Sequence, residues 1–225
     1  MRMVKVRANM AHVLIIGASK GIGLEATRQC LAAGHAVRAF ARSADAIALT
    51  HPQLEKMRGD ARDAADVGAA VQGVDVVIQA LGIGLGDLFR PVSLFSEATR
   101  VLLAAMGAHG VRRLIAVTGF GAGDSRSRIG LLQSVPFQAV FGRAYADKSE
   151  QERLIVQSPL DWTIVRPGVL TNQAWSGQYQ ILETATEWRN GVVSRANVAD
   201  FLVRLIDDQT YLRKAPVVIG RGLRR

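Results

Sequence analysis

Short apolar segments alternate with segments of helical periodicity along most of the 225-residue chain. Runs of β-branched and aliphatic residues predict strands at 12–16, 36–41, 54–58, 74–80, 113–118, 161–165 and 216–219. Apolar residues three and four apart predict helices at about 21–33, 63–71, 92–109, 141–157 and 195–207. This alternation is typical of βαβ units. It predicts an α/β fold, a doubly wound parallel sheet with ligands at the carboxyl ends of its strands.

Two segments interrupt the alternation. Residues 82–91 and 119–138 hold Gly, Ser, Arg and Pro directly after the fourth and fifth predicted strands. Long loops at this edge of a sheet are more often functional than loops at the opposite edge. We therefore expect both segments at the rim of an active site.

The composition favours one globular domain, because 49% of the residues are hydrophobic and 21% are charged. No apolar run approaches the roughly 20 residues that span a bilayer, so we expect a soluble protein without a membrane segment. The expected organisation is a basic leader at 1–10, a single Rossmann domain at 11–220 with a small C-terminal extension on the substrate side, and a basic tail at 221–225.

The net charge of +9 lies mainly at the two ends of the chain. Residues 1–7 and 213–225 hold eight of the 28 basic residues and no acid, which leaves 20 bases against 19 acids between them. The nearly neutral body argues against a nucleic-acid groove. The ends are interpreted as solvated tails, with an anchor for nucleic acid or acidic lipid as the alternative.

Cysteine and histidine usage gives no metal site. Cys30 is the only cysteine, so it has no intramolecular disulfide partner, and the four histidines are scattered. No Cys/His cluster has metal-ligand spacing. We expect no bound metal and a reducing, cytoplasmic setting.

A glycine-rich loop follows the first predicted strand and leads into a helix. Glycines there allow a tight turn and a close approach of a pyrophosphate, and the helix N-terminus offers free N–H groups to an anion. The predicted dinucleotide contacts in this loop are Gly17, Ser19, Lys20, Gly21, Ile22 and Gly23. The alternative is a tight turn that binds nothing.

The end of the second predicted strand bears on which dinucleotide is bound. An NAD site usually places an acidic residue there, whereas this strand ends in Arg42 and Ser43. A guanidinium can bind a 2′-phosphate through charge-assisted hydrogen bonds, and Lys20 in the adjacent loop can reach the same group. The sequence predicts NADP(H) in preference to NAD(H). Alternatively, Arg42 is a solvated surface residue.

The next two strand ends supply further cofactor candidates. Asp60 and Ala61 follow the third strand, where they can pair with the adenine; the alternative is a helix N-cap by Asp60 or Asp63. Ala80, Leu81 and Gly82 follow the fourth strand, where small residues let the chain pass beneath a cofactor.

These motifs resemble the atypical branch of the short-chain dehydrogenase/reductase superfamily, which includes the NmrA-like and flavin reductase/biliverdin reductase B-like groups. The resemblance covers about residues 11–220, and its most specific segment is 158–168, SPLDWTIVRPG. Its other marks are the glycine loop, Gly59-Asp60, Ala80-Leu81-Gly82, Ala104-Ala105-Met106, Ala108-His109-Gly110-Val111, Val117-Thr118-Gly119, and Lys148 with Glu152.

The resemblance implies three catalytic candidates. Thr118 corresponds to the hydroxyl at the end of strand five, and Lys148 to the lysine that holds the nicotinamide ribose. The usual tyrosine lies four residues before the lysine, where this chain has Ala144; Tyr145 lies only three before it. Carbonyl reduction by a Tyr/Lys pair is therefore not the expected chemistry, and Tyr145 is either catalytic or a partly buried helix aromatic.

This departure fits the flavin reductase-like group, which requires no tyrosine acid. Residues 166–170 are expected to line the nicotinamide end, with Pro167, Gly168 and Val169 as cofactor contacts. An apolar wall for a planar acceptor is expected from Phe120, Phe137, Phe141, Trp175 and Tyr179, with core packing as the alternative for each.

The predicted function is an NADPH-dependent oxidoreductase that transfers hydride to a small-molecule flavin, quinone or carbonyl acceptor. The alternatives are a non-catalytic NADP(H) sensor of the NmrA type that acts through a protein partner, and an assembly or structural factor that retains a dinucleotide. The sequence leaves open whether the protein is a monomer or a homodimer.

Overall fold

A sheet of eight strands forms the centre of the structure, a computed structural model that describes residues 10–82, 93–128 and 131–221. Every neighbouring pair is parallel except the edge pair β10–β8. The predicted doubly wound parallel sheet is confirmed, with one antiparallel edge strand. In spatial order the strands are β3 (Leu54–Arg58), β2 (Ala36–Ala41), β1 (His12–Ile16), β4 (Val76–Gln79), β5 (Arg113–Val117), β6 (Asp161–Pro167), β10 (Val217–Gly220) and β8 (Tyr179–Leu182).

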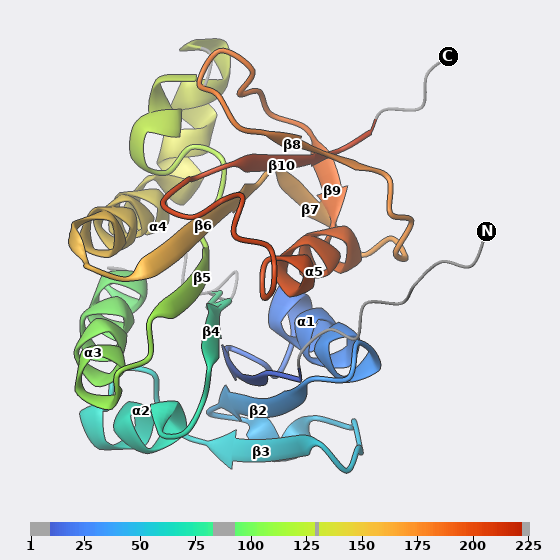
Figure 1. Ribbon diagram of the computed structural model, residues 1–225. Helices are drawn as coiled ribbons and strands as arrows, with labels where there is room; N and C mark the ends of the chain where they lie inside the picture. The colour runs from blue at the N-terminus through green and yellow to red at the C-terminus, as the bar shows by residue number, and fades with distance from the viewer. Residues whose placement is uncertain (1–9, 83–92, 129–130, 222–225) are drawn as a thin grey trace.

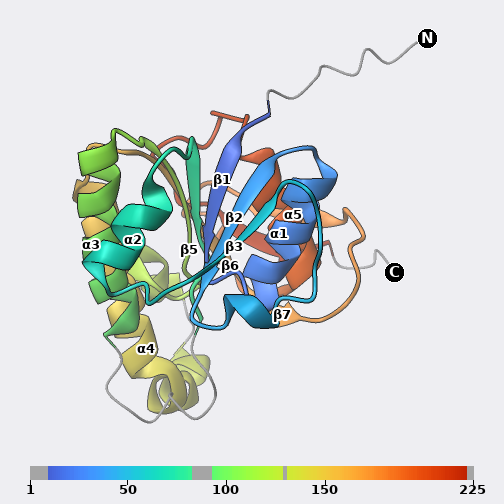
Figure 2. The ribbon, with the colours of Figure 1, turned by 90° about the horizontal axis from the view of Figure 1, so that it is seen from below.

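Helices cover both faces of this sheet (Figures 1 and 2). In β1, Val13 and Ile15 pack toward α1 and α5, while Leu14 and Ile16 pack toward the opposite helices. The period of two explains why the central strands are apolar on both faces. One face carries α1 (Gly21–Ala32) and α5 (Arg195–Arg204), and the other α2 (Ala64–Val71), α3 (Leu94–His109) and α4 (Leu131–Gln157).

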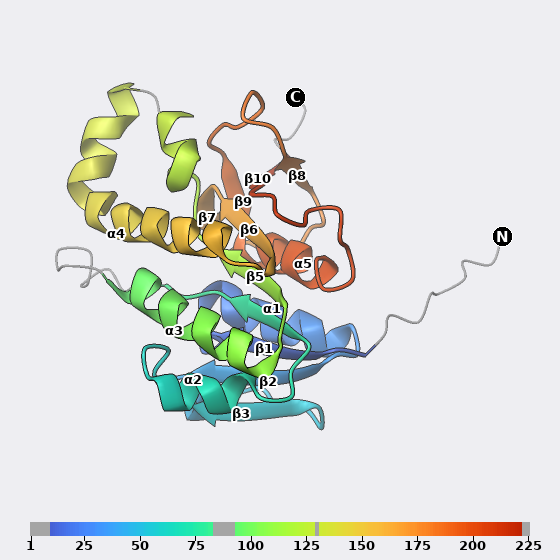
Figure 3. The same ribbon diagram turned by 60° about the vertical axis from the view of Figure 1, so that its left-hand side comes forward.

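The strand order reverses at β1 and β4. From β1 the chain continues outward to β2 and β3, and it then returns to β4, β5 and β6 on the other side of β1 (Figure 3). Such a switch point leaves a crevice at the carboxyl ends of the two strands. Gly17 and Ala80 leave β1 and β4 there, so close that a Cβ on Gly17 would lie 2.7 Å from the Ala80 carbonyl oxygen.

The structure differs from the prediction for the second interrupting segment, residues 119–138. Helix α4 begins at Leu131, so the prediction of a loop through residue 138 is wrong. Pro136 lacks an N–H group and is disfavoured inside a helix, yet the helix includes it. A 3₁₀ helix, η3 (Gly123–Arg128), occupies part of the remaining segment. Except for Gly82, the other segment lies outside the described residues, as do residues 1–9 and 222–225 of the predicted leader and tail.

Three short strands were not predicted. The edge strand β8 is one, and the others are β7 (Val169–Thr171) and β9 (Val192–Ser194), which form a separate parallel pair. Segments of three or four residues are too short for periodicity to identify. Together with α5, they form the structure that follows β6 and returns the chain to the sheet.

Candidate functional site

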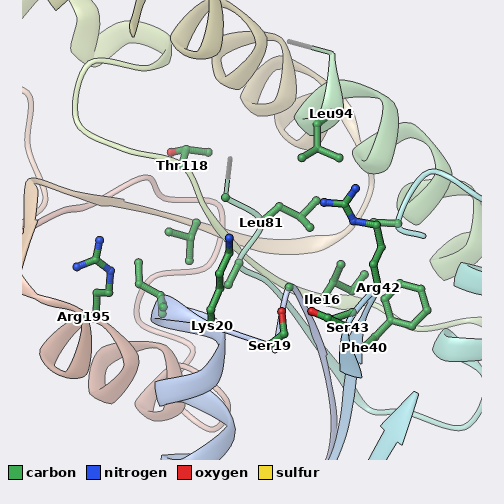
Figure 4. A pocket seen from close by; sticks show the side chains of 18 of the residues that line it. Ile16, Ser19, Lys20, Phe40, Arg42, Ser43, Leu81, Leu94, Thr118 and Arg195 are labelled. Carbon is green, nitrogen blue, oxygen red and sulfur yellow. The ribbon is translucent and has the colours of Figure 1, made fainter. Parts of the chain in front are cut away.

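A cavity of about 690 Å³ lies at the carboxyl ends of the central strands (Figure 4). Its lining comes from segments far apart in sequence, as expected at a switch point. The predicted cofactor residues that line it are Gly17, Ser19, Lys20, Gly21, Ile22, Arg42, Ser43, Asp60, Ala61, Ala80, Leu81, Gly82, Thr118, Lys148 and Pro167.

The glycine loop gives this cavity an anion-accepting floor. Gly21 has φ +61°, a conformation that favours glycine. A Cβ on Gly23 would lie only 2.2 Å from the Gly17 carbonyl oxygen, so Gly23 shapes the loop without lining the cavity. No side chain caps the N-terminus of α1 at Lys20. Its N–H groups are therefore available to a phosphate, as a dinucleotide site requires.

The charged side chains that line the cavity among the described residues are Lys20, Arg42, Asp60, Lys148 and Arg195. The acid among them is paired within the protein, because Arg62 Nη2 lies 3.0 Å from Asp60 Oδ2. Hydrogen bonding from Arg62 lowers the pKa of Asp60. The positive excess suits a ligand with several phosphate charges.

The alternative considered for Asp60, capping of the following helix, belongs to Asp63. Its carboxylate accepts hydrogen bonds from the backbone N–H groups of Ala65 and Asp66, both at 2.9 Å. Asp60 is thus left at the cavity wall, at the position predicted for the adenine.

Lys148 and Thr118 meet at the other end of the cavity. Lys148 Nζ donates a 2.7 Å hydrogen bond to the Thr118 carbonyl oxygen and lies 4.4 Å from the centre of the Phe95 ring. Burial lowers the pKa of Lys148 to about 8, although the negative charges of Glu152 and Asp147 oppose this. The ammonium can therefore exchange its proton near neutral pH.

The side chain of Thr118 contacts a buried ion pair between Glu152 and Arg166. The Thr118 hydroxyl donates to Glu152 Oε1 at 2.7 Å. Arg166 holds the same carboxylate through Nε at 3.0 Å and Nη2 at 2.6 Å. Burial lowers the pKa of Arg166, but hydrogen bonds and charges from Glu152 and Asp124 raise it overall. The side chain of Arg166 also lies over the Trp188 ring, at 4.9 Å from the ring centre.

Helix α4 is fixed against α3 by a second carboxylate. Asp147 is buried and accepts a 2.8 Å hydrogen bond from the Phe95 backbone N–H at the start of α3. Lys148 and Glu152, one turn apart, are thereby held at the end of β5.

Tyr145 does not line the cavity. Its hydroxyl lies against Gly119, where a Cβ would be 2.8 Å away. Burial raises the pKa of Tyr145. The tyrosine that lies three residues before Lys148, instead of the usual four, is therefore placed beside the chain that leaves β5.

The segment after β6 reaches the cavity through Pro167 and Leu170. Gly168 packs against the second short sheet, since a Cβ there would lie 2.1 Å from the Gly191 carbonyl oxygen. Val169 is 55% exposed and pairs with Val192 in the neighbouring strand. Gly168 and Val169 therefore do not line the cavity.

Among the aromatic residues considered for an acceptor wall, none whose side chain is described lines this cavity. Phe120 packs with Leu182 in a small core cluster. Trp175 is 60% exposed, and both Trp175 and Tyr179 donate hydrogen bonds to Asp200. Phe141 is 36% exposed and is not in the lining, and the side chain of Phe137 lies outside the described part. Pattern alone does not assign these aromatic side chains to a common wall.

Sequence reasoning missed several lining residues, among them Leu94, Asn172 and Arg195. Arg195 begins a helix that was predicted, so its secondary structure was available from the sequence. That α5 packs against α1 depends on long-range contacts, which no local pattern reveals.

We also searched the described part of the chain for a metal site, a reactive thiol and a membrane-spanning helix. It contains no group of three or more His, Cys, Asp or Glu residues arranged to hold a metal ion. Burial raises the pKa of the Cys30 thiol to about 12. No helix in this part combines the length and apolar character needed to cross a membrane.

Comparison with known proteins agrees with this geometry. Residues 17–209 match a family described as NAD(P)H-binding. An uncharacterized chloroplastic protein of Arabidopsis thaliana is 28% identical over 216 residues, which cover 93% of this chain and 77% of that protein.

Two solved structures share the fold. ChuY, an anaerobillin reductase from Escherichia coli O157:H7, has a TM-score of 0.80 and 28% identity, covering 95% of this chain and 99% of that one. A short-chain dehydrogenase/reductase from Veillonella parvula in complex with NADP has a TM-score of 0.81 and 17% identity, covering 96% of this chain and 98% of that one. The second likeness concerns the fold alone.

Proposed function

The chain belongs to the NAD(P)H-binding family, within the atypical short-chain dehydrogenase/reductase superfamily, and we propose that it is an NADPH-dependent oxidoreductase acting on a small planar acceptor. One observation carries the proposal. A single cavity joins the glycine loop and Arg42 to Thr118 and Lys148. It therefore offers groups for phosphates and for a nicotinamide ribose in one continuous space.

The residues present fit a dinucleotide phosphate. Gly23 has no room for a side chain against the loop, and the N-terminus of α1 is left without a side-chain cap. Arg42 and Lys20 would bind the 2′-phosphate that distinguishes NADPH from NADH. Lys148 would hold the nicotinamide ribose. The bound cofactor would supply the hydride, while the protein binds and orients both reactants.

The acceptor class is proposed from two features. Tyr145 does not line the cavity, so the usual tyrosine acid of carbonyl reduction is not placed there. ChuY, which resembles this chain over nearly its whole length, is an anaerobillin reductase. We therefore propose a conjugated planar acceptor, with flavins and quinones tested before simple carbonyls. Lys148 Nζ would provide a proton to the reduced acceptor.

A second candidate is a non-catalytic NADP(H) sensor of the NmrA type. The bond from the Thr118 hydroxyl to Glu152 favours it, because that proton is already engaged within the protein. A sensor needs the same cofactor groups but no proton donor, and it would act through a protein partner.

Turnover and binding measured on one sample separate the two candidates. Oxidation of NADPH and NADH is followed with FMN, riboflavin, quinones and simple aldehydes, and both cofactors are titrated. The reductase proposal predicts NADPH-selective turnover with planar acceptors. Lys148→Met should reduce this turnover, whereas Lys214→Met, at an exposed residue paired with Glu183, should not. Tight NADPH binding without any turnover would favour the sensor.

A further inference from the structure

An arginine from the C-terminal part of the chain lies beside the glycine loop. Arg195 is the first residue of α5 and lines the cavity. Its Nε would lie 3.8 Å from a Cβ placed on Gly21, the first residue of α1. Gln29 Nε2 donates to the Ala196 carbonyl oxygen at 2.9 Å and fixes the two helices together. The proximity thus results from packing between helices distant in sequence.

The guanidinium of Arg195 is oriented by a neutral partner. Arg195 Nη1 donates to Asn172 Oδ1 at 2.7 Å, and Asn172 also lines the cavity. Arg195 takes part in none of the ion pairs found among the described residues. An amide fixes the direction of the group without neutralising it, so its charge is available to an anion.

Arg42 and Arg195 lie at different places in the cavity, and these places correspond to different phosphates of a dinucleotide. Arg42 follows β2, whereas Arg195 adjoins the N-terminus of α1, and Figure 4 shows Lys20 between them in that view. An anion at a helix N-terminus beside a glycine loop is the pyrophosphate in a dinucleotide site. The 2′-phosphate belongs at the end of the second strand.

We propose that Arg195, oriented by Asn172, binds the pyrophosphate of the cofactor together with the glycine loop, beside the N-terminus of α1. This inference rests on the proposed cofactor site but does not require turnover. It gives the structure after β6 a direct role in cofactor binding: β7 leads into Asn172, and α5 begins with Arg195. Binding of the 2′-phosphate then depends on Arg42 and not on Arg195.

Titration with whole cofactors and fragments tests this division. The probes are NADPH, NADH, ADP, which has the 5′-diphosphate alone, and 2′-AMP, which has the 2′-phosphate alone. Arg195→Ala should weaken NADPH, NADH and ADP by about tenfold or more, as expected for a lost charge-assisted bond, and leave 2′-AMP unchanged. Arg42→Ala should weaken NADPH and 2′-AMP and leave NADH and ADP nearly unchanged.

Three further variants serve as a control and as additional tests of the charge and orientation of Arg195. Arg28→Ala removes an exposed charge from α1, outside the cavity lining, and should change no affinity. Arg195→Lys should retain part of the ADP affinity if charge is what matters. If Arg195→Ala does not fold, Asn172→Ala, at an exposed residue, should still weaken ADP about threefold by releasing the guanidinium.

The outcomes distinguish this proposal from the proposed function. If NADPH does not bind the parent protein, the cofactor proposal itself fails. If NADPH binds but Arg195→Ala leaves ADP and NADH unchanged, only the pyrophosphate role is overturned. Equal weakening of ADP and 2′-AMP, with a lower melting temperature of the free protein, would make Arg195 a structural residue and also overturn the proposal.

Discussion

The hydroxyl of Thr118 donates its proton to the buried carboxylate of Glu152 across 2.7 Å. Lys148, one turn earlier on α4, donates to the carbonyl oxygen of the same threonine. Thr118 is therefore held by α4 through both its side chain and its backbone. In this arrangement its hydroxyl oxygen can only accept a hydrogen bond from a ligand.

The Glu152–Arg166 pair should couple strongly in a double-mutant cycle. Both side chains are buried, and Arg166 Nη1 has no hydrogen-bond partner among the described residues. Glu152→Leu should reduce the free energy of unfolding by about 3 kcal/mol, because among the described residues it leaves Arg166 with the exposed Asp124 as its one acidic partner. Urea unfolding of Glu152→Leu, Arg166→Met and the double variant should show a double loss well below the sum. Additive losses would show that the pair is not coupled.

Activity should fall as the pH rises through about 8. Burial lowers the pKa of Lys148 to about 8, so the ammonium that would hold the ribose is lost above that pH. The value of kcat/KM for NADPH reports ionisations of the free enzyme. It should be level below about pH 7 and decline above pH 8. Lys148→Met should have a lower value without this decline, and persistence of the decline in that variant would contradict the assignment.

Gly23 should tolerate no side chain. A Cβ there would lie 2.2 Å from the Gly17 carbonyl oxygen, so Gly23→Ala must move the loop away from α1. We expect a loss of stability of about 1–3 kcal/mol and weaker NADPH binding. Gly68→Ala is the control, because a Cβ there meets no atom within 4 Å and alanine favours the α2 helix by about 0.5–1 kcal/mol. Similar effects of the two substitutions on urea unfolding and cofactor titration would contradict this explanation.

Reversing the charge of Arg42 should change the choice of cofactor. Arg42→Asp replaces a group that would bind the 2′-phosphate with one that repels it, so NADPH affinity should fall about 10–100-fold. NADH affinity should change much less. Arg58→Asp, at the end of the neighbouring β3 and outside the cavity lining, should alter neither by more than about twofold. Calorimetric titration gives both affinities, and unchanged NADPH binding by Arg42→Asp would remove the phosphate role.

The sequence was sufficient for the features determined by local pattern. The strands at 12–16 and 36–41 match β1 and β2 because their apolar residues, with the β-branched positions among them, lie between clear turn signals. The strand at 54–58 also matches β3, although only Leu54 and Met57 in it are apolar. The glycine loop was recognisable because its chemistry depends on neighbouring residues. Most residues placed at strand ends line one cavity because parallel strands direct their carboxyl ends to one edge.

Features that depend on tertiary packing were not predictable in the same way. Pro136 lies inside α4, contrary to its local preference, and β7, β8 and β9 are too short for a periodic signal. Arg195 reaches the loop only because α5 packs on α1. Phe120, Trp175 and Tyr179, which were assigned to an acceptor wall, have polar or core partners that sequence spacing does not reveal.

Hydride transfer from NADPH to a planar acceptor in the cavity is tested most directly with NADPH that carries deuterium at nicotinamide C4 in one configuration or the other. Each form is mixed with the protein and an acceptor under nitrogen, and the NADP⁺ formed is analysed by mass spectrometry.

We expect the protein to accelerate NADP⁺ formation, and we expect the deuterium to be lost from one form and kept in the other, because the cofactor is held in one orientation. NADPH that binds without being consumed by any acceptor, or that loses deuterium equally from both forms, would contradict the account.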